Sequence, residues 1–218
     1  MQLTAEVRWF WLGTPPVDFE KWFWDPSPEY CRAGGGGERT DIYLLDPQQV
    51  ELGIKMRKAP GDTEVKGLIQ ISRSPVSFTP KLSGNIELWC KWKTRAFQFS
   101  PHAGISIQKT RWIRKFSAEE RPLREIALNE EEGPQVQMAL PTTGCNAELT
   151  RIIDNEGKAW WSIGFEAFGA LALVEHALRS AVDLMLERKP PQLPPGHNAS
   201  YPKWLSENQF LKLKRSSG

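Results

Sequence analysis

Hydrophobic and polar residues alternate along much of the chain, beginning within its first eleven positions. Every second residue from Leu3 to Trp11 is apolar, and Glu6 and Arg8 lie between them. Successive side chains of an extended chain point to opposite faces of a sheet. The N-terminal segment is therefore predicted to be a strand with one apolar face and one charged face.

Seven further segments look extended and are separated by clusters of Gly, Pro, Asp and Ser. These predicted strands cover residues 39–45, 52–57, 64–71, 86–94, 105–116, 146–153 and 160–168. The last two flank the sequence Asp154-Asn155-Glu156-Gly157, which is typical of a hairpin turn. Eight strands with few helices favour a closed antiparallel sheet, because closure removes exposed strand edges.

Helical patterns are confined to three stretches. Residues 169–187 place apolar side chains on one stripe, and the prolines that follow stop the helix. Residues 17–24 and 118–128 predict two shorter helices, the second weakened by Pro122. The predicted fold class is α+β, mainly β: an antiparallel eight-stranded β-barrel with flanking helices.

One barrel domain over residues 1–188 accounts for these elements. Residues 189–218 are expected to form a Pro-rich tether and a C-terminal tail that packs on this domain or frays from it, with Tyr201 and Trp204 as an aromatic anchor. The four glycines at 34–37 are expected to form a flexible connection. A phosphate loop is excluded there, because no Gly-Lys-Ser/Thr follows them.

Composition leaves the partner open and favours a reducing compartment. The chain has 218 residues and a net charge of +2, so a phosphate site must come from local clustering of charge. Cys31, Cys90 and Cys145 form no C-x-x-C pair and are expected to be free thiols. No apolar stretch is long enough to span a bilayer and no signal peptide is recognised, so we expect a cytoplasmic protein without a membrane partner.

Charged side chains share one face of every predicted strand. A sheet face that meets water is a simple explanation for such a pattern. Several strands, however, carry like charges at positions i and i+2, which lie only about 6–7 Å apart on one face. This repulsion is tolerable where an anion lies between the side chains, so an anion site is the alternative explanation.

The charged strands carry short motifs in a distinctive order. They read Thr4-Ala-Glu6-Val-Arg8, Arg39-Thr-Asp41-Ile-Tyr43, Ile54-Lys55-Met56-Arg57, Glu64-Val-Lys66-Gly67, Lys109-Thr-Arg111, Glu148-Leu-Thr150 and Gly164-Phe-Glu166. Over roughly residues 1–188 this series resembles the CYTH family, the triphosphate-tunnel or thiamine-triphosphatase-like proteins. Members of that family fold as an antiparallel barrel whose charged faces point into a tunnel.

The resemblance implies that basic residues bind a triphosphate or polyphosphate chain. The residues concerned are Arg8, Arg39, Lys55, Arg57, Lys66, Lys91, Lys109 and Arg111. It also implies that Glu6, Glu148 and Glu166 are catalytic and hold one or two divalent ions, magnesium or manganese (Mg²⁺ or Mn²⁺), which activate water for phosphoanhydride hydrolysis. Glu87 is a further candidate ligand. Hard cations prefer carboxylate oxygens, and phosphoryl transfer depends on charge neutralisation and positioning.

Three positions depart from the family pattern. Thr4 stands where the family has its first glutamate, Arg8 stands where it has a lysine, and Gly164 stands at an acidic position of the last strand. We therefore expect a metal-dependent hydrolase of triphosphates or inorganic polyphosphate with low activity. Two alternatives remain: a non-catalytic module that binds polyphosphate or a nucleotide, and a β domain that recruits partners through residues 22–24 and the tail. No specific nucleic acid is expected, and the oligomeric state stays open.

Overall fold

The computed structural model describes residues 1–24, 30, 32–44, 50–57, 62–129, 134 and 139–216. Cys31, the last residue of the predicted strand at Leu45 and the final two residues of the tail lie outside this part of the chain. Cys90 and Cys145, which are described, are free thiols as predicted.

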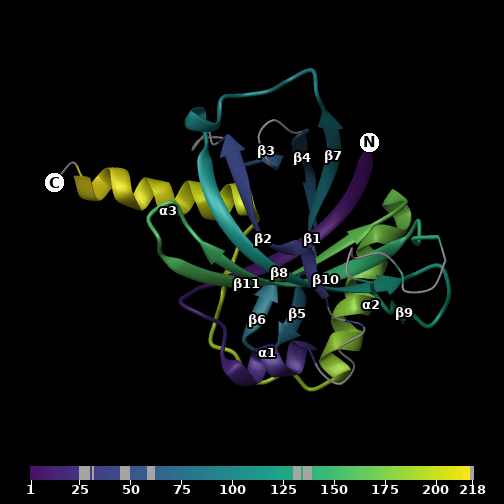
Figure 1. Ribbon diagram of the computed structural model, residues 1–218. Coiled ribbons are helices and arrows are strands. Elements are labelled where there is room, and N and C mark those ends of the chain that lie inside the picture. Colours follow the sequence, from purple (N-terminus) through teal and green to yellow (C-terminus); the bar gives the residue numbers. More distant parts are fainter. Residues whose placement is uncertain are drawn as a thin grey trace.

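The described residues form the following elements. In chain order they are β1 (Gln2–Leu12), α1 (Val17–Trp24), β2 (Arg32–Leu44), β3 (Leu52–Arg57), β4 (Thr63–Ile71), β5 (Val76–Thr79), β6 (Leu82–Gly84), β7 (Glu87–Thr94), the 3-10 turn η2 (Pro101–Ala103), β8 (Ile105–Ser117), β9 (Arg124–Ile126), β10 (Gly144–Ile153), β11 (Ala159–Phe168), α2 (Leu171–Glu187), β12 (His197–Asn198) and α3 (Tyr201–Ser216). Figure 1 shows their arrangement.

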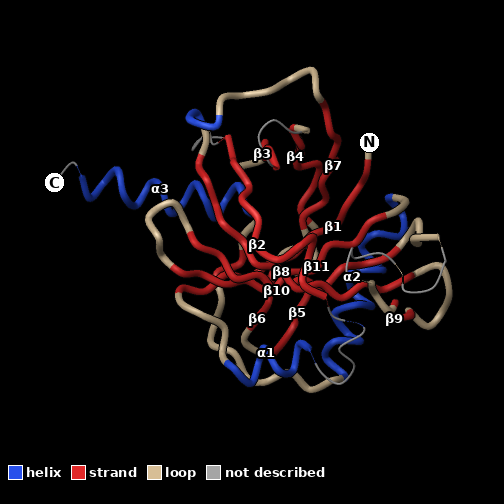
Figure 2. The backbone as a smooth tube through the Cα atoms, in the orientation of Figure 1, coloured by secondary structure: helices blue, strands red, loops and turns tan. Residues whose placement is uncertain are grey.

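Eight of these strands close into an antiparallel barrel. Within the described residues they are hydrogen-bonded in the order β10-β11-β1-β7-β4-β3-β2-β8, and β8 pairs with β10 to complete the ring. Each of these pairings is antiparallel. β9 extends the sheet from β8, and β12 pairs with β1 outside the ring. The predicted mainly-β fold, an eight-stranded barrel with flanking helices, is confirmed (Figure 2).

The main apolar core lies against the outside of one barrel wall. Ala5, Val7 and Trp9 of β1 belong to it together with apolar residues of β10 and β11. α1, α2 and the β5–β6 hairpin cover this wall (Figure 1). Because side chains alternate along a strand, burying the apolar residues outside the barrel turns Glu6 and Arg8 toward its interior.

The aromatic residues of α1 are part of this core. Phe19 and Phe23 are fully buried, and the indole N–H of Trp22 donates to the backbone carbonyl of Arg188 at 2.9 Å. The ring of Trp24 lies 5.7 Å from that of Trp112. The Trp-rich segment therefore packs α1 onto the barrel, and its role in recruiting a partner stays a prediction.

Two local predictions are wrong. Residues 34–37 lie within β2, where the pairing with β8 shifts register between Ala33 and Glu38, so the glycines sit at an irregularity of a strand and do not form a loop. Residues 118–128 are not helical and contain the short strand β9, which pairs with β8. Proline lacks a backbone N–H, so Pro122 does not support a helix there.

The first residues of α3 fill one end of the barrel. The rings of Phe10 and Trp204 stack at 4.8 Å, and those of Tyr43 and Tyr201 stack at 5.9 Å. We call these four residues the aromatic plug. Ile107, Ile152 and Leu205 pack in the same buried cluster. The predicted anchor residues, Tyr201 and Trp204, thus enter the barrel end, while the rest of α3 extends away from it (Figure 1).

Candidate functional site

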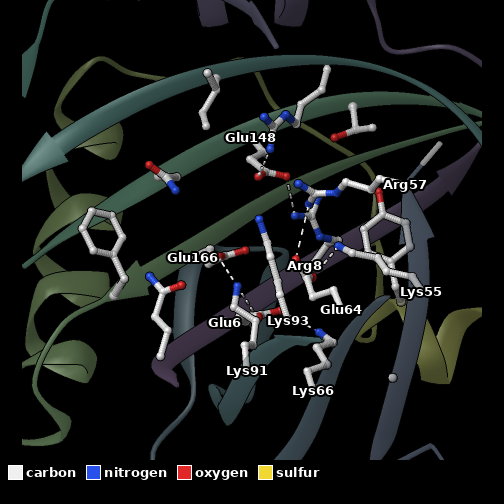
Figure 3. Close-up of a pocket in the computed structure, with 18 of the residues that line it drawn as sticks. Glu6, Arg8, Lys55, Arg57, Glu64, Lys66, Lys91, Lys93, Glu148 and Glu166 are labelled. Carbon is white, nitrogen blue, oxygen red and sulfur yellow. Dashed lines mark hydrogen bonds and ion pairs between the residues drawn. The ribbon is translucent and has the colours of Figure 1, made fainter. Parts of the chain in front are cut away.

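A cavity of about 740 Å³ lies inside the barrel. All eight barrel strands contribute side chains to its lining, and the close-up in Figure 3 shows several of them converging. Among the lining residues, ten are lysine or arginine and four are glutamate. The charged strand faces therefore turn inward onto one shared cavity, and the alternative that they meet bulk water outside the barrel is wrong.

All eleven site residues predicted from the sequence line this cavity. They are Glu6, Arg8, Arg39, Lys55, Arg57, Lys66, Lys91, Lys109, Arg111, Glu148 and Glu166. The strand register explains their convergence, because Arg39 lies opposite Lys109 and Lys66 lies opposite Lys91. Glu87 is not among the lining residues; burial raises its pKa.

At the plug end of the cavity, Asp41 holds a group of cations. Its carboxylate lies 3.1 Å from Lys109, 3.4 Å from Arg39 and 3.8 Å from Arg57. Burial would raise the pKa of Asp41, but Lys109 and the other cations lower it below its usual range. Asp41 is therefore an ionised counter-charge inside the barrel wall.

Lys109 is the most deeply buried cation of the cavity lining. Its Nζ donates to the hydroxyl of Tyr43 at 2.6 Å and lies 3.5 Å from the centroid of the Tyr201 ring. Burial lowers the pKa of Lys109 to about 7, although Asp41 opposes this shift and Arg39 adds to it. Lys109 therefore gains and loses its proton near neutral pH.

In the middle of the cavity, Glu148 bridges two arginines. Its Oε2 accepts from Arg8 at 2.9 Å and its Oε1 accepts from Arg111 at 3.0 Å. Arg8 also donates to the hydroxyl of Ser162 at 3.0 Å. Burial would raise the pKa of Glu148, but Arg111 and Arg8 hold it well below its usual range.

Farther from the plug, Glu6 and Glu166 share a lysine. Figure 3 shows Lys91 between them; it pairs with Glu166 and lies 3.8 Å from Glu6. Lys66 donates to Oε2 of Glu6 at 2.9 Å, and the Thr4 hydroxyl donates to Oε1 at 3.1 Å. Burial would raise the pKa of Glu6, but Lys66 and Lys91 lower it to about 2.

One further ion pair in the cavity lining connects β3 to β4. Lys55 and Glu64 lie 2.7 Å apart, and Arg57 approaches Glu64 at 3.8 Å. Burial lowers the pKa of Lys55 to about 8, although Glu64 opposes the shift. This pair brings a further carboxylate and two predicted phosphate ligands to the same cavity.

Sequence reasoning missed several residues of the site. Asp41 and Glu64 shared a face with predicted basic residues, so their phase along the strand was a usable signal. Lys93 and Lys115 were in phase as well and line the cavity. Tyr201 had no such signal, because it follows a proline-rich segment whose path the sequence does not specify.

Two of the three predicted metal ligands, Glu6 and Glu148, do not fit a divalent ion as they are arranged. Both oxygens of Glu6 and both oxygens of Glu148 already accept hydrogen bonds from side chains of the protein. No group of three or more His, Cys, Asp or Glu side chains in the described part of the chain is placed to hold a metal. The magnesium or manganese ion implied by the resemblance stays a prediction that this donor set does not favour.

The fold and the site together define a class: a closed antiparallel β-barrel with a cation-rich interior cavity that is plugged at one end. No family model matches the chain, and no sufficiently similar curated protein is found for it. The resemblance to the CYTH family therefore stays a prediction. None of the helices in the described ranges is long and apolar enough to cross a membrane.

Proposed function

We propose that the barrel cavity binds one end of a triphosphate or polyphosphate chain. The observation that carries this proposal is the excess of cations in an enclosed space: ten lysines and arginines line the cavity with four glutamates, and the buried Asp41 adds one more carboxylate behind the lining. Charges removed from water are costly unless opposite charges compensate them. A ligand with several negative charges supplies the compensation that the carboxylates leave incomplete.

The distribution of the cations favours a chain of phosphates over a single anion. Lys109 lies beside the plug, and Lys115 lies six residues farther along the same strand. At about 3.3 Å per residue, the two positions are roughly 20 Å apart along the strand. One phosphate cannot reach both positions, whereas a linear polyphosphate extends between them and a triphosphate occupies the part of this length nearer Lys109. Arginine is also well suited to phosphate, because its planar fork can donate two parallel hydrogen bonds.

The aromatic plug determines how such a chain enters. Phe10 and Trp204 are buried at the end beyond Lys109, whereas Lys93 and Leu140 are exposed at the other end of the lining. A phosphate chain therefore enters past Lys93 with one end foremost. Its terminal phosphate reaches Lys109, and a nucleoside or the rest of a longer chain stays at the mouth.

A hydrolase acting on the same ligand is the second candidate. Glu6 and Glu166 are cross-strand neighbours in the cavity wall, so two carboxylates lie close to the basic residues. Lys66 and Lys91 engage them, and the geometry therefore favours binding over catalysis. A phosphate-release assay on several triphosphates, with magnesium and then with manganese, separates the two candidates. Release that the Glu166→Gln variant loses would establish the hydrolase.

Titration calorimetry with sodium tripolyphosphate at low salt tests the binding proposal. We expect one tripolyphosphate per chain and loss of most of the binding in the double variant Arg57→Ala/Arg111→Ala. The matched control is Arg73→Ala/Arg95→Ala, which removes two exposed arginines that do not line the cavity. If the wild-type protein shows neither binding heat nor a rise in melting temperature at low salt, the proposal is wrong.

A further inference from the structure

We propose that the cavity binds its phosphate chain without a divalent ion, because the Arg8 guanidinium occupies the space that a metal and a carboxylate at position 164 would need. This inference rests on the proposed function of the cavity. It goes further in specifying the ligand as the metal-free polyanion, with a cation of the protein in place of a bound metal.

Arg8 is held in a fixed position by neighbours from other strands and from α3. Its Nη2 lies 2.9 Å from Oε2 of Glu148, and its Nη1 lies 3.0 Å from the hydroxyl of Ser162. Its guanidinium carbon lies 5.0 Å from the centroid of the Tyr201 ring. The side chain is only 10 % exposed. A charge fixed in this way needs no reorganisation to meet a phosphate.

The close approach of Arg8 to β11 depends on the glycine at position 164. Arg8 and Gly164 are cross-strand neighbours. A Cβ atom placed on Gly164 would lie 2.5 Å from the guanidinium carbon and 2.8 Å from both Nε and Nη2 of Arg8. Any side chain at 164 would therefore displace the guanidinium, and a carboxylate at this position is incompatible with Arg8 as it lies here.

The three predicted metal ligands also face protein cations, and Glu166 pairs with Lys91 through one of its oxygens. Oε2 of Glu148 accepts a hydrogen bond from Arg8, and Oε1 accepts one from Arg111. Glu6 accepts from Lys66 and from the hydroxyl of Thr4. Position 4 thus supplies a hydroxyl donor and position 164 supplies space for a guanidinium, so neither position offers a carboxylate to a metal. Arginine stays protonated at every physiological pH, so this cation is permanent.

The preference for a metal-free ligand follows from charge. A magnesium ion bound to tripolyphosphate cancels part of the negative charge that the cationic cavity attracts, and its own charge is repelled by Arg8. Excess magnesium should therefore compete with the protein for the ligand instead of bridging the two.

Calorimetry of the wild-type protein with tripolyphosphate, in EDTA and then in excess magnesium at equal ionic strength, tests this directly. We expect affinity in EDTA to exceed that in magnesium by at least about tenfold, as weakened charge attraction requires. Tighter binding in magnesium than in EDTA would overturn the inference. Absence of binding in both buffers would instead refute the proposed function, and the manganese experiment then decides only whether Arg8 excludes a metal from the cavity.

A manganese titration without phosphate tests whether Arg8 excludes a metal ion from the cavity. The paramagnetic resonance signal of free Mn²⁺ reports how much of the ion is bound. We expect no site in the wild-type protein or in the control Arg95→Ala. The double variant Arg8→Ala/Gly164→Glu, which removes the guanidinium and supplies a carboxylate, should gain one site. A stoichiometric site in the wild-type protein that Glu148→Gln abolishes would overturn the inference. So would a correctly folded double variant that gains no site.

Discussion

The Nζ atom of Lys109 lies 3.5 Å from the centre of the Tyr201 ring. Lys109 belongs to β8 in the barrel wall, and Tyr201 is the first residue of α3. A desolvated cation over an aromatic face is stabilised by roughly 2 kcal/mol. The contact makes the start of α3 part of the cavity wall and closes the barrel at the end where cations surround Asp41.

The first prediction concerns the stability of the aromatic plug. Trp204 is 2 % exposed and stacks on Phe10. Replacing a buried tryptophan by alanine leaves a large cavity, so Trp204→Ala should lower the free energy of unfolding by about 3–5 kcal/mol. Urea denaturation measures this. Trp92→Ala is the control, because Trp92 is 42 % exposed and should cost clearly less. Equal losses for both variants would show that α3 is not docked in the barrel end.

The second prediction concerns the pH dependence of binding. The pKa of Lys109 is lowered to about 7, so Lys109 carries its charge at pH 6 and has lost most of it at pH 8.5. Tripolyphosphate should therefore bind the wild-type protein more tightly than Lys109→Met at pH 6, by about tenfold, and the advantage should shrink as the pH rises to 8.5.

Tripolyphosphate itself changes its charge over this pH range. Because this change affects the wild-type protein and Lys109→Met equally, it cancels in the ratio of their affinities at each pH. Calorimetry at pH 6, 7 and 8.5 gives the ratio of the two affinities. A ratio that stays constant over this range would show that Lys109 does not change its charge in the free protein. Lys158→Met, which removes an exposed lysine outside the cavity, should match the wild-type protein throughout.

The third prediction concerns acid stability. Lys66 and Lys91 lower the pKa of Glu6 from 4.5 to about 2 in the folded protein. A carboxyl with a lowered pKa stabilises the fold fully above its unfolded pKa, and this contribution is lost as pH falls from about 4.5 to 2. The shift corresponds to about 3 kcal/mol. Glu6→Gln should therefore be less stable than the wild-type protein at pH 7, and the difference should shrink by pH 2.5.

Urea denaturation at pH 7, 5 and 2.5 measures this difference. The control is Glu187→Gln, which changes an exposed glutamate at the end of α2 and should stay within about 0.5 kcal/mol of the wild-type protein. If Glu6→Gln loses stability in parallel with the wild-type protein between pH 7 and 2.5, Glu6 does not carry the predicted charge interaction.

Much of the barrel could be predicted because local alternation encodes it. The alternation in β1 predicted both the strand and the face that carries Glu6 and Arg8, and the strand at Leu52–Arg57 was predicted with the bounds the structure has. The residues of the cavity lining were predictable for the same reason, since one phase of each strand must face one side of the sheet.

Other features could not be predicted because they depend on distant parts of the chain. The β5–β6 hairpin consists of strands of four and three residues, too short for a clear period. The entry of Tyr201 into the barrel depends on the path of the segment before it. The sequence showed that Gly164 cannot ligate a metal. It did not show that the Arg8 guanidinium lies against Gly164, because this contact depends on the pairing register of β1 and β11, which no local pattern contains.

The fourth prediction concerns the end of the ligand. In the part of the chain that the structure describes, the aromatic plug closes one end of the cavity, so we expect a phosphate chain to need a free end to reach Lys109. Adenosine triphosphate has a free terminal phosphate, whereas diadenosine tetraphosphate has similar charge but a nucleoside at both ends. In EDTA we expect the second to bind at least about tenfold more weakly than the first. Equal affinities in calorimetry would show that the cavity accepts internal segments and that the plug does not set the direction of entry.

A crystal structure of the protein grown with sodium tripolyphosphate and EDTA is the most direct test of the cavity as a phosphate site. We predict three phosphates in a row inside the barrel, the innermost one within hydrogen-bond distance of Lys109 and the next ones facing Arg8 and Arg111. Tripolyphosphate bound only on the outer surface, or an interior that stays free of phosphate at saturating ligand, would contradict the prediction and leave the cations of the barrel with a structural role alone.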